Sequence, residues 1–217
     1  MIKNIGLVWL RDDFRINKNT ALLEAVSKHE QVVVFFLYKE KKFLEQEAQK
    51  WWVSKSLKQF RSKLDLYNIN LEIIRSETYK IFFEKLFDKK NFSIYWNKIY
   101  EPSYIKFDEY LTKKFNSKKI EFKIFKGNIL NEFGEIKKAD GTPFKVFTPF
   151  WRTAEKFYSE KIPPKEKKIS KCAKKIKYFK NIINESEIYP YKNWFKKFEK
   201  FWDPSEESAL RELKNFL

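Results

Sequence analysis

Short apolar runs alternate with helix-patterned segments through the first 125 residues, and few folds accommodate that alternation. Five runs rich in β-branched and aromatic residues predict buried strands, at residues 5–10, 31–37, 71–74, 92–96 and 120–125. The segments between them have helical spacing, at residues 19–28, 46–67, 77–87 and 102–115. Alternation at this pace is typical of βαβ units with right-handed crossovers. We therefore expect an α/β fold: a five-stranded, parallel, Rossmann-like sheet with helices on both faces.

The second half of the chain has a less regular pattern. Asp140-Gly141 marks a tight turn between short extended pieces, which predicts a β-hairpin that ends at Thr148-Pro149. Beyond it the pattern weakens into a lysine-rich stretch with Pro163-Pro164, typical of a linker that runs over a domain surface. A final helix is expected within residues 204–217, capped by Ser205.

The chain is strongly basic, with 46 Lys and Arg against 29 Asp and Glu and a formal net charge of +17. A nucleic-acid partner is one interpretation of this charge. The other is compositional drift, because Lys far outnumbers Arg and Arg is the better fork for phosphate. No RRM, KH or helix-turn-helix pattern accompanies the charge, so a basic nucleic-acid-binding protein is a minor hypothesis.

Residue counts and spacings exclude several classes of site. Cys172 is the single cysteine and His29 the single histidine, so a disulfide framework and a Cys/His zinc site cannot form, and a reducing, cytoplasmic location is expected. The four glycines form neither a G-x-G-x-x-G nor a P-loop arrangement, which argues against a dinucleotide or P-loop site. No apolar run is long enough for a membrane span, so no membrane partner is expected. We expect no catalytic residue and no metal ligand in this chain.

Ligands of an open parallel sheet bind beyond the carboxyl ends of the strands, where the strand order reverses. In a sheet of this type that crevice usually lies between the first and fourth strands. The first strand runs into Trp9–Arg15 and the fourth into Trp96–Pro102, and both loops are dense in aromatic and charged residues. We expect the two loops to meet at one rim, with Arg11 and Glu101 there. The alternative, given equal weight, is that the charged residues form ion pairs and caps that hold the loops.

Five stretches, taken in order along the chain, resemble motifs of the DNA photolyase and cryptochrome family. They are VWLRDDFR followed by NKNTAL, WWVSKSL, YWNKIYEPSYIKFD, DGTPFKVFTPFWR and FWDPSEESALRELKNFL. The resemblance covers nearly the whole chain. The last two motifs and the loop after the fourth strand are the more specific ones.

The resemblance implies a domain plan. Residues 1–132 would be the α/β antenna domain, 133–203 a hairpin and interdomain linker, and 204–217 the first helix of a truncated helical FAD-binding domain. FAD would then be bound only in the missing part of that helical domain. Three aromatic residues of the fourth motif would be packing anchors where the chain leaves the sheet: Phe147, Phe150 and Trp151.

The resemblance also implies a function, that of the N-terminal light-harvesting portion of a deoxyribodipyrimidine photolyase-like protein. Joined to its FAD domain, such a protein would be a lyase that uses light to repair pyrimidine dimers in DNA. Its partners would be DNA, reached through the full-length protein, and its own helical FAD domain or a separately encoded equivalent. Two alternatives stay open: a stand-alone nucleotide- or flavin-binding α/β module, and a cryptochrome-type photoreceptor fragment without repair activity.

In this family the antenna domain holds a second chromophore, of folate or deazaflavin/flavin type, that passes excitation energy to the flavin. The positions that match the family's chromophore pocket are Arg11, Phe35, Leu37, Tyr38, Gln49, Trp52, Asn97, Ile99 and Glu101. Gln49 and Ile99 depart from the deazaflavin pattern, and Ser103-Tyr104 departs from the folate pattern. The identity of the chromophore is therefore left open, and an empty pocket is a further alternative.

Overall fold

The computed structural model describes residues 4–39, 47–159, 168–190 and 193–217. Its centre is a six-stranded sheet in the order β5-β4-β1-β2-β3-β6. The strands are β1 (Ile5–Leu10), β2 (Val32–Tyr38), β3 (Asn70–Arg75), β4 (Phe92–Asn97), β5 (Phe122–Phe125) and β6 (Ile182–Ile183). The first five are parallel, as predicted, and the strand order reverses between β1 and β4.

Strand β6 corrects the predicted count of five strands. It contains two residues and pairs antiparallel with β3, Ile182 opposite Ile74 and Ile183 opposite Ile73. Two residues are too few to show a period in the sequence. Contacts of the surrounding segment with the sheet determine where β6 lies, and these contacts join residues that are far apart in the sequence.

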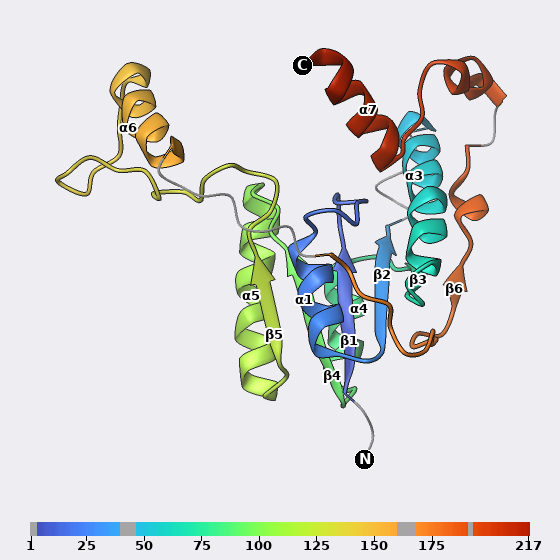
Figure 1. Ribbon diagram of the computed structural model, residues 1–217. Helices are drawn as coiled ribbons and strands as arrows, with labels where there is room; N and C mark the ends of the chain where they lie inside the picture. Colours follow the sequence, from blue (N-terminus) through green and yellow to red (C-terminus); the bar gives the residue numbers. More distant parts are fainter. Residues whose placement is uncertain (1–3, 40–46, 160–167, 191–192) are drawn as a thin grey trace.

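Helices cover both faces of the sheet, as expected (Figure 1). The helical elements are α1 (Thr20–Lys28), α3 (Glu47–Asp65), α4 (Tyr79–Leu86), α5 (Pro102–Lys118), α6 (Phe147–Ser159), η1 (Glu185–Ile188), η2 (Asn193–Lys200) and α7 (Glu206–Phe216). On one face, strand residues such as Val8 join α1 and α3 residues such as Leu57 in a buried core. On the other face, Trp9 and its neighbours pack with α4 and α5 residues such as Phe83. Because both faces are covered, the central strands β1 and β2 are continuous apolar runs in the sequence.

Three helix starts carry the residues that favour a helix N-terminus, and the predicted Ser205 cap is one of them. The Asn19 side chain accepts a hydrogen bond from the backbone N–H of Leu22 at 3.2 Å, which caps α1. Ser205 caps α7 in the same way through the N–H of Ser208 at 3.1 Å. Pro102 is the first residue of α5, where its missing N–H removes no helical hydrogen bond.

Residues 168–190 form a return segment that passes from one face of the sheet to the other. Cys172 is buried in the core under α1 and α3, whereas Phe179 packs against the core under α4 and α5. The fully buried carboxylate of Glu72 on β3 accepts hydrogen bonds from the backbone N–H groups of Tyr178 at 2.8 Å and Phe179 at 2.7 Å. A buried carboxylate needs such donors, and here the return segment supplies them.

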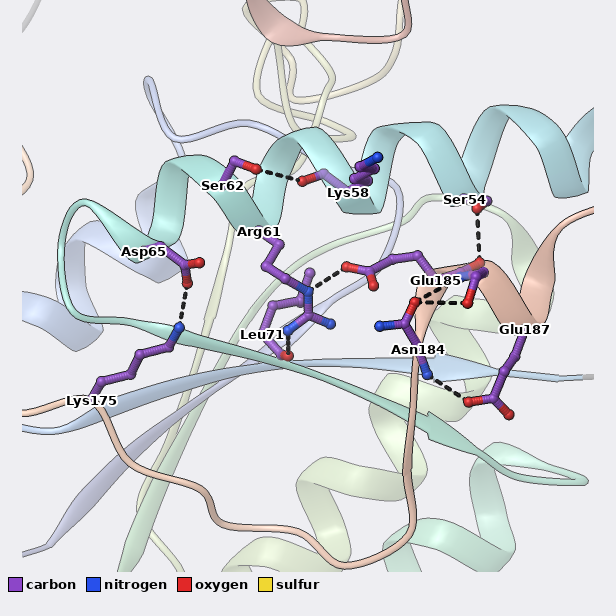
Figure 2. Close-up of polar contacts among 11 residues, drawn as sticks. Ser54, Lys58, Arg61, Ser62, Asp65, Leu71, Lys175, Asn184, Glu185 and Glu187 are labelled. Atoms are coloured by element: carbon purple, nitrogen blue, oxygen red, sulfur yellow. Dashed lines mark hydrogen bonds and ion pairs between the residues drawn. The ribbon is translucent and has the colours of Figure 1, made fainter.

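Figure 2 shows a second anchor of the return segment, on α3. The Glu185 carboxylate accepts a hydrogen bond from Arg61, and the Glu185 carbonyl accepts one from the Ser54 hydroxyl at 2.8 Å. Arg61 also donates to the carbonyl of Leu71 on β3, so one side chain joins helix, sheet and return segment. These contacts hold η1 against α3, and α7 then lies at the carboxyl end of the strands (Figure 1).

The predicted β-hairpin around Asp140-Gly141 is wrong. The tight turn is present, with the N–H of Lys138 donating to the carbonyl of Thr142 at 3.0 Å, but no strand flanks it among the described residues. Instead α6 begins at Phe147, where the hairpin is predicted to end. Pro149 lies in the first turn of α6, where proline is compatible with a helix, so it does not end the regular structure there.

Two of the three predicted packing anchors on α6 are exposed, so the prediction is wrong for Phe147 and Trp151. Phe147 is 71% exposed and Trp151 is 46% exposed, while Phe150 is half-buried. Figure 1 shows α6 standing away from the sheet. The helix also occupies part of the predicted linker, whose Pro163-Pro164 lies outside the described residues.

Candidate functional site

The loops after β1 and β4 meet at the carboxyl edge of the sheet, as the sequence predicts. Between them lies a cleft of about 500 Å³, here called the rim cleft, which both loops line together with Gly127 and Asn128. Arg11 comes to it from the first loop and Glu101 from the second. The cleft lies where the strand order reverses, the usual ligand position in an open α/β sheet.

The guanidinium of Arg11 is buried and bonded on three sides. Its two terminal nitrogens donate to the two carboxylate oxygens of Asp108, at 3.1 and 3.2 Å. Its Nε donates to the carbonyl of Asn97 at 3.1 Å, and the ring of Trp9 lies 4.8 Å from the guanidinium carbon. The contacts of Arg11 therefore favour the alternative in which it joins β1, β4 and α5, since little of its charge is left for a ligand.

Asp108 supplies the carboxylate that pairs with the buried Arg11 guanidinium. Burial raises the pKa of its carboxyl group above the ordinary value, and the Arg11 guanidinium opposes that rise. Sequence analysis missed Asp108 because its partner lies 97 positions away. An acidic residue on the buried side of the helix after the fourth strand is the signal that could have drawn attention to it.

The first-turn amides of α1 are already used by protein groups. The side-chain oxygen of Asn97 accepts from the N–H of Ala21 at 3.2 Å, beside the Asn19 cap. The Asn97 amide nitrogen donates to Asn19 at 2.8 Å and to the Asp13 carboxylate. A helix N-terminus after the first strand is the usual phosphate site of dinucleotide-binding folds. Here two of its donors are occupied, which agrees with the lack of a glycine-rich motif.

A larger cleft of about 1240 Å³ lies between the β1–α1 loop, the start of α3 and residues 199–212; we call it the aromatic cleft. Trp52 of α3 is 41% exposed and Trp202 is 55% exposed, and their ring centroids are 6.0 Å apart in an edge-to-face contact. Phe14 and Phe201 line the same cleft. Exposed aromatic faces around a concave space are typical of sites for planar ligands.

A contact between α7 and the β1–α1 loop closes one end of the aromatic cleft. The Glu206 carboxylate accepts hydrogen bonds from the backbone N–H groups of Ile16 and Asn17, both at 2.9 Å. Lys63 of α3 lies 3.5 Å from the same carboxylate, whose side chain is 8% exposed. Sequence analysis missed this role. The sequence feature that could have indicated this role is an acidic residue directly after the Ser205 cap, within the motif FWDPSEE.

The nine predicted pocket residues lie in different places. Four line the rim cleft: Arg11, Asn97, Ile99 and Glu101. Three are buried in the two cores: Phe35, Leu37 and Tyr38. Trp52 lines the aromatic cleft, and Gln49 is exposed near it in sequence, on the first turns of α3. A ligand in either cleft would therefore contact some of these residues and not the rest.

The fold and the two clefts define a class of protein, an α/β domain that presents its ligand side at the carboxyl edge of a parallel sheet. The model of the DNA photolyase family matches residues 6–168, and the chain belongs to that family.

Curated relatives are longer than this chain. The chain is 28% identical over 215 residues to the deoxyribodipyrimidine photo-lyase of Agrobacterium fabrum, a match that covers 97% of this chain and 44% of the relative. It is 26% identical over 149 residues to cryptochrome-2 of Arabidopsis thaliana, covering 67% of this chain and 24% of the relative. The chain thus spans less than half the length of these relatives and corresponds to their N-terminal portion.

Solved structures show the same fold. A class III photolyase from Agrobacterium tumefaciens superposes with a TM-score of 0.81 at 26% identity, over 100% of this chain and 45% of that one. A photolyase from Sulfolobus tokodaii, described with two FAD molecules and a novel light-harvesting cofactor, gives a TM-score of 0.62 at 20% identity, over 85% of this chain and 40% of that one. This second likeness speaks for the fold alone.

Two further properties concern the described part of the chain. None of its helices combines the length and the apolar character that crossing a membrane requires. Within the same residues, no group of three or more His, Cys, Asp or Glu side chains is arranged to hold a metal ion.

Proposed function

We propose that this chain is the light-harvesting portion of a deoxyribodipyrimidine photolyase-like protein. Its family and its correspondence to the N-terminal portion of longer photolyases support the proposal. The observation that carries it is the aromatic cleft, where the exposed rings of Trp52 and Trp202 border a space of about 1240 Å³. That space accommodates a planar chromophore stacked on an indole face.

The chromophore would be of folate or deazaflavin/flavin type. The rim cleft suits a planar ring less well, because Tyr100 is its one aromatic wall and several of its polar groups bond one another. We therefore place the chromophore in the aromatic cleft.

In the whole protein, excitation energy would pass from this chromophore to an FAD in a helical domain that α7 begins. The domain plan of residues 1–132, 133–203 and 204–217 belongs to this proposal. DNA would be the partner of the whole protein, which would repair pyrimidine dimers with light, and the FAD domain would be covalently joined or separately encoded. A cytoplasmic location, supported by the single cysteine, completes the proposal.

An absorption spectrum of the purified chain tests the proposal. We expect a near-ultraviolet or blue band to copurify, because the cleft would retain its chromophore. Trp52→Ala should lose most of the band. Trp151→Ala, which removes an indole of similar exposure on α6 outside both clefts, should keep the band.

A colourless wild-type chain that binds neither added folate nor added flavin would contradict the proposal. Binding of a nucleotide by such a colourless chain would support the stand-alone nucleotide-binding module instead. A band that survives Trp52→Ala would move the chromophore out of the aromatic cleft.

A further inference from the structure

Arg15, in the β1–α1 loop, is a charged residue whose side chain has no partner in the described part of the chain. It lines both the rim cleft and the aromatic cleft. Among the described residues, its guanidinium takes part in no hydrogen bond, ion pair or ring contact. The residue is half-buried, and a guanidinium carries five N–H donors that favour a carboxylate or phosphate.

The other arginines near these clefts are occupied. Arg11 is bonded to Asp108 and to the carbonyl of Asn97. Arg211, on the α7 wall of the aromatic cleft, donates to the Ser208 hydroxyl at 2.9 Å and lies 3.6 Å from the Glu212 carboxylate. Of these three arginines, Arg15 is therefore the one whose side chain has no partner among the described residues.

The backbone on both sides of Arg15 is held in place. Its N–H donates to the Asp13 carbonyl at 2.6 Å, and its carbonyl accepts from the Asn19 side chain at 3.1 Å. The next two N–H groups, of Ile16 and Asn17, donate to the Glu206 carboxylate. The fixed backbone lowers the cost of ordering the loop when a ligand binds, and the remaining cost is the ordering of the Arg15 side chain itself.

We propose that Arg15 binds the anionic tail of a planar ligand whose ring stacks in the aromatic cleft, and that Glu206 positions the loop that carries Arg15. The inference rests on the proposed function and deepens it. It names the class of ligand: a planar ring with a carboxylate or phosphate tail, in preference to a neutral ring.

FMN and riboflavin test this proposal, because they share a ring and differ by one phosphate. In fluorescence titrations the wild-type chain should bind FMN about tenfold or more tightly than riboflavin, the effect of a charge-assisted contact. Arg15→Gln should bind the two equally, with its riboflavin affinity unchanged. Arg211→Gln, the same loss of charge in the same cleft, should keep the preference. If the wild type binds both flavins without preferring FMN, or if the preference survives Arg15→Gln, the proposal is overturned.

The ratio of FMN affinity to riboflavin affinity also tests whether Glu206 is a positioning residue. Glu206→Ala should lower the ratio of FMN affinity to riboflavin affinity, because it releases the loop amides that hold the backbone next to Arg15. Glu207→Ala is the matched control, since Glu207 pairs with Lys63 as Glu206 does but makes no hydrogen bond to the loop. Equal preferences in Glu206→Ala and wild type would refute the positioning role.

A ring-free anion separates this inference from the proposed function. Inorganic phosphate, added at constant ionic strength, should raise the thermal midpoint of the wild type and of Arg211→Gln more than that of Arg15→Gln. If neither the two flavins nor added folate binds the wild type, the planar ligand of the proposed function is lost and phosphate decides the anion site. A larger rise in the chains that keep Arg15 then supports that site, and an equal rise in all three overturns it.

Discussion

The Arg11–Asp108 pair shows how a charged loop can serve the fold instead of a ligand. The two side chains are 2% and 11% exposed, with a bidentate contact between them. Removing charges from water costs several kcal/mol for each ion, and here geometry and the Asn97 carbonyl offset that cost. The pair therefore fixes the relative position of both loops that form the rim cleft.

Arg11→Gln should destabilise the chain by about 3–5 kcal/mol near neutral pH, since it leaves a buried carboxylate unpaired. Without the guanidinium, the pKa of Asp108 rises further above its ordinary value, because burial is then less opposed. A folded-state pKa above the unfolded one gives stability that is present in acid and lost as the pH rises through the raised pKa. The gap between wild type and variant should therefore shrink in acid, as measured by urea unfolding at several pH values.

The control for this prediction is Arg75→Gln, which alters an exposed arginine 3.7 Å from Glu187. It should change the free energy of unfolding by about 0–1 kcal/mol at each pH. A gap between wild type and Arg11→Gln that stays constant with pH, or widens in acid, would contradict the role given to Asp108.

Residue-level prediction from sequence succeeds where a fold rule applies and fails where a distant contact decides. The rule for parallel sheets correctly places Arg11 and Glu101 at one rim. The partner of Arg11 is 97 positions away, and the contact between Glu206 and Ile16 joins residues 190 positions apart. No local sequence pattern contains those pairings. The sequence therefore cannot show that the Arg11 side chain has a partner and that the Arg15 side chain has none among the described residues.

The same contrast holds for elements. Strands β1 to β4 are predictable because nearly all of their residues are buried and most are apolar, whereas β5 is only partly buried. Strand β6 is not, because contacts of the return segment create it. Helix α6 is also missed, since its aromatic residues and Pro149 resemble the end of a hairpin as much as the first turn of a helix.

Glu72→Gln tests whether one buried carboxylate holds the return segment. The carboxylate accepts from Asn70 at 2.8 Å as well as from the N–H groups of Tyr178 and Phe179. Glutamine keeps one acceptor oxygen, and its NH₂ group in place of the other would face an N–H donor that it cannot satisfy. We expect a loss of about 1–3 kcal/mol and faster proteolysis within residues 168–190. Glu77→Gln, an exposed change before α4, should alter neither. Equal proteolysis of Glu72→Gln and wild type would show that other contacts suffice.

At the scale of the whole molecule, the carboxyl end of the sheet carries apolar surface that the described chain leaves open. Phe201 is 83% exposed, and Leu213 and Phe216 of α7 are 52% and 87% exposed. Large exposed apolar patches on soluble proteins usually mark surfaces that another structure covers. The chain spans 44% of the Agrobacterium fabrum photo-lyase, so its relatives contain further polypeptide that could cover this end.

Self-association of the purified chain should therefore depend on α7. Leu213→Glu combined with Phe216→Glu should lower the apparent mass at high concentration in light-scattering chromatography, because the patch becomes charged. The thermal midpoint should barely change, since both side chains are exposed in the monomer. The control combines Asn215→Glu with Ala209→Glu, which adds the same charge at two exposed positions of α7 outside the apolar patch. This control should leave association unchanged. An apparent mass that falls equally in both double variants would assign the effect to net charge, and the apolar surface of α7 would then have no part in it.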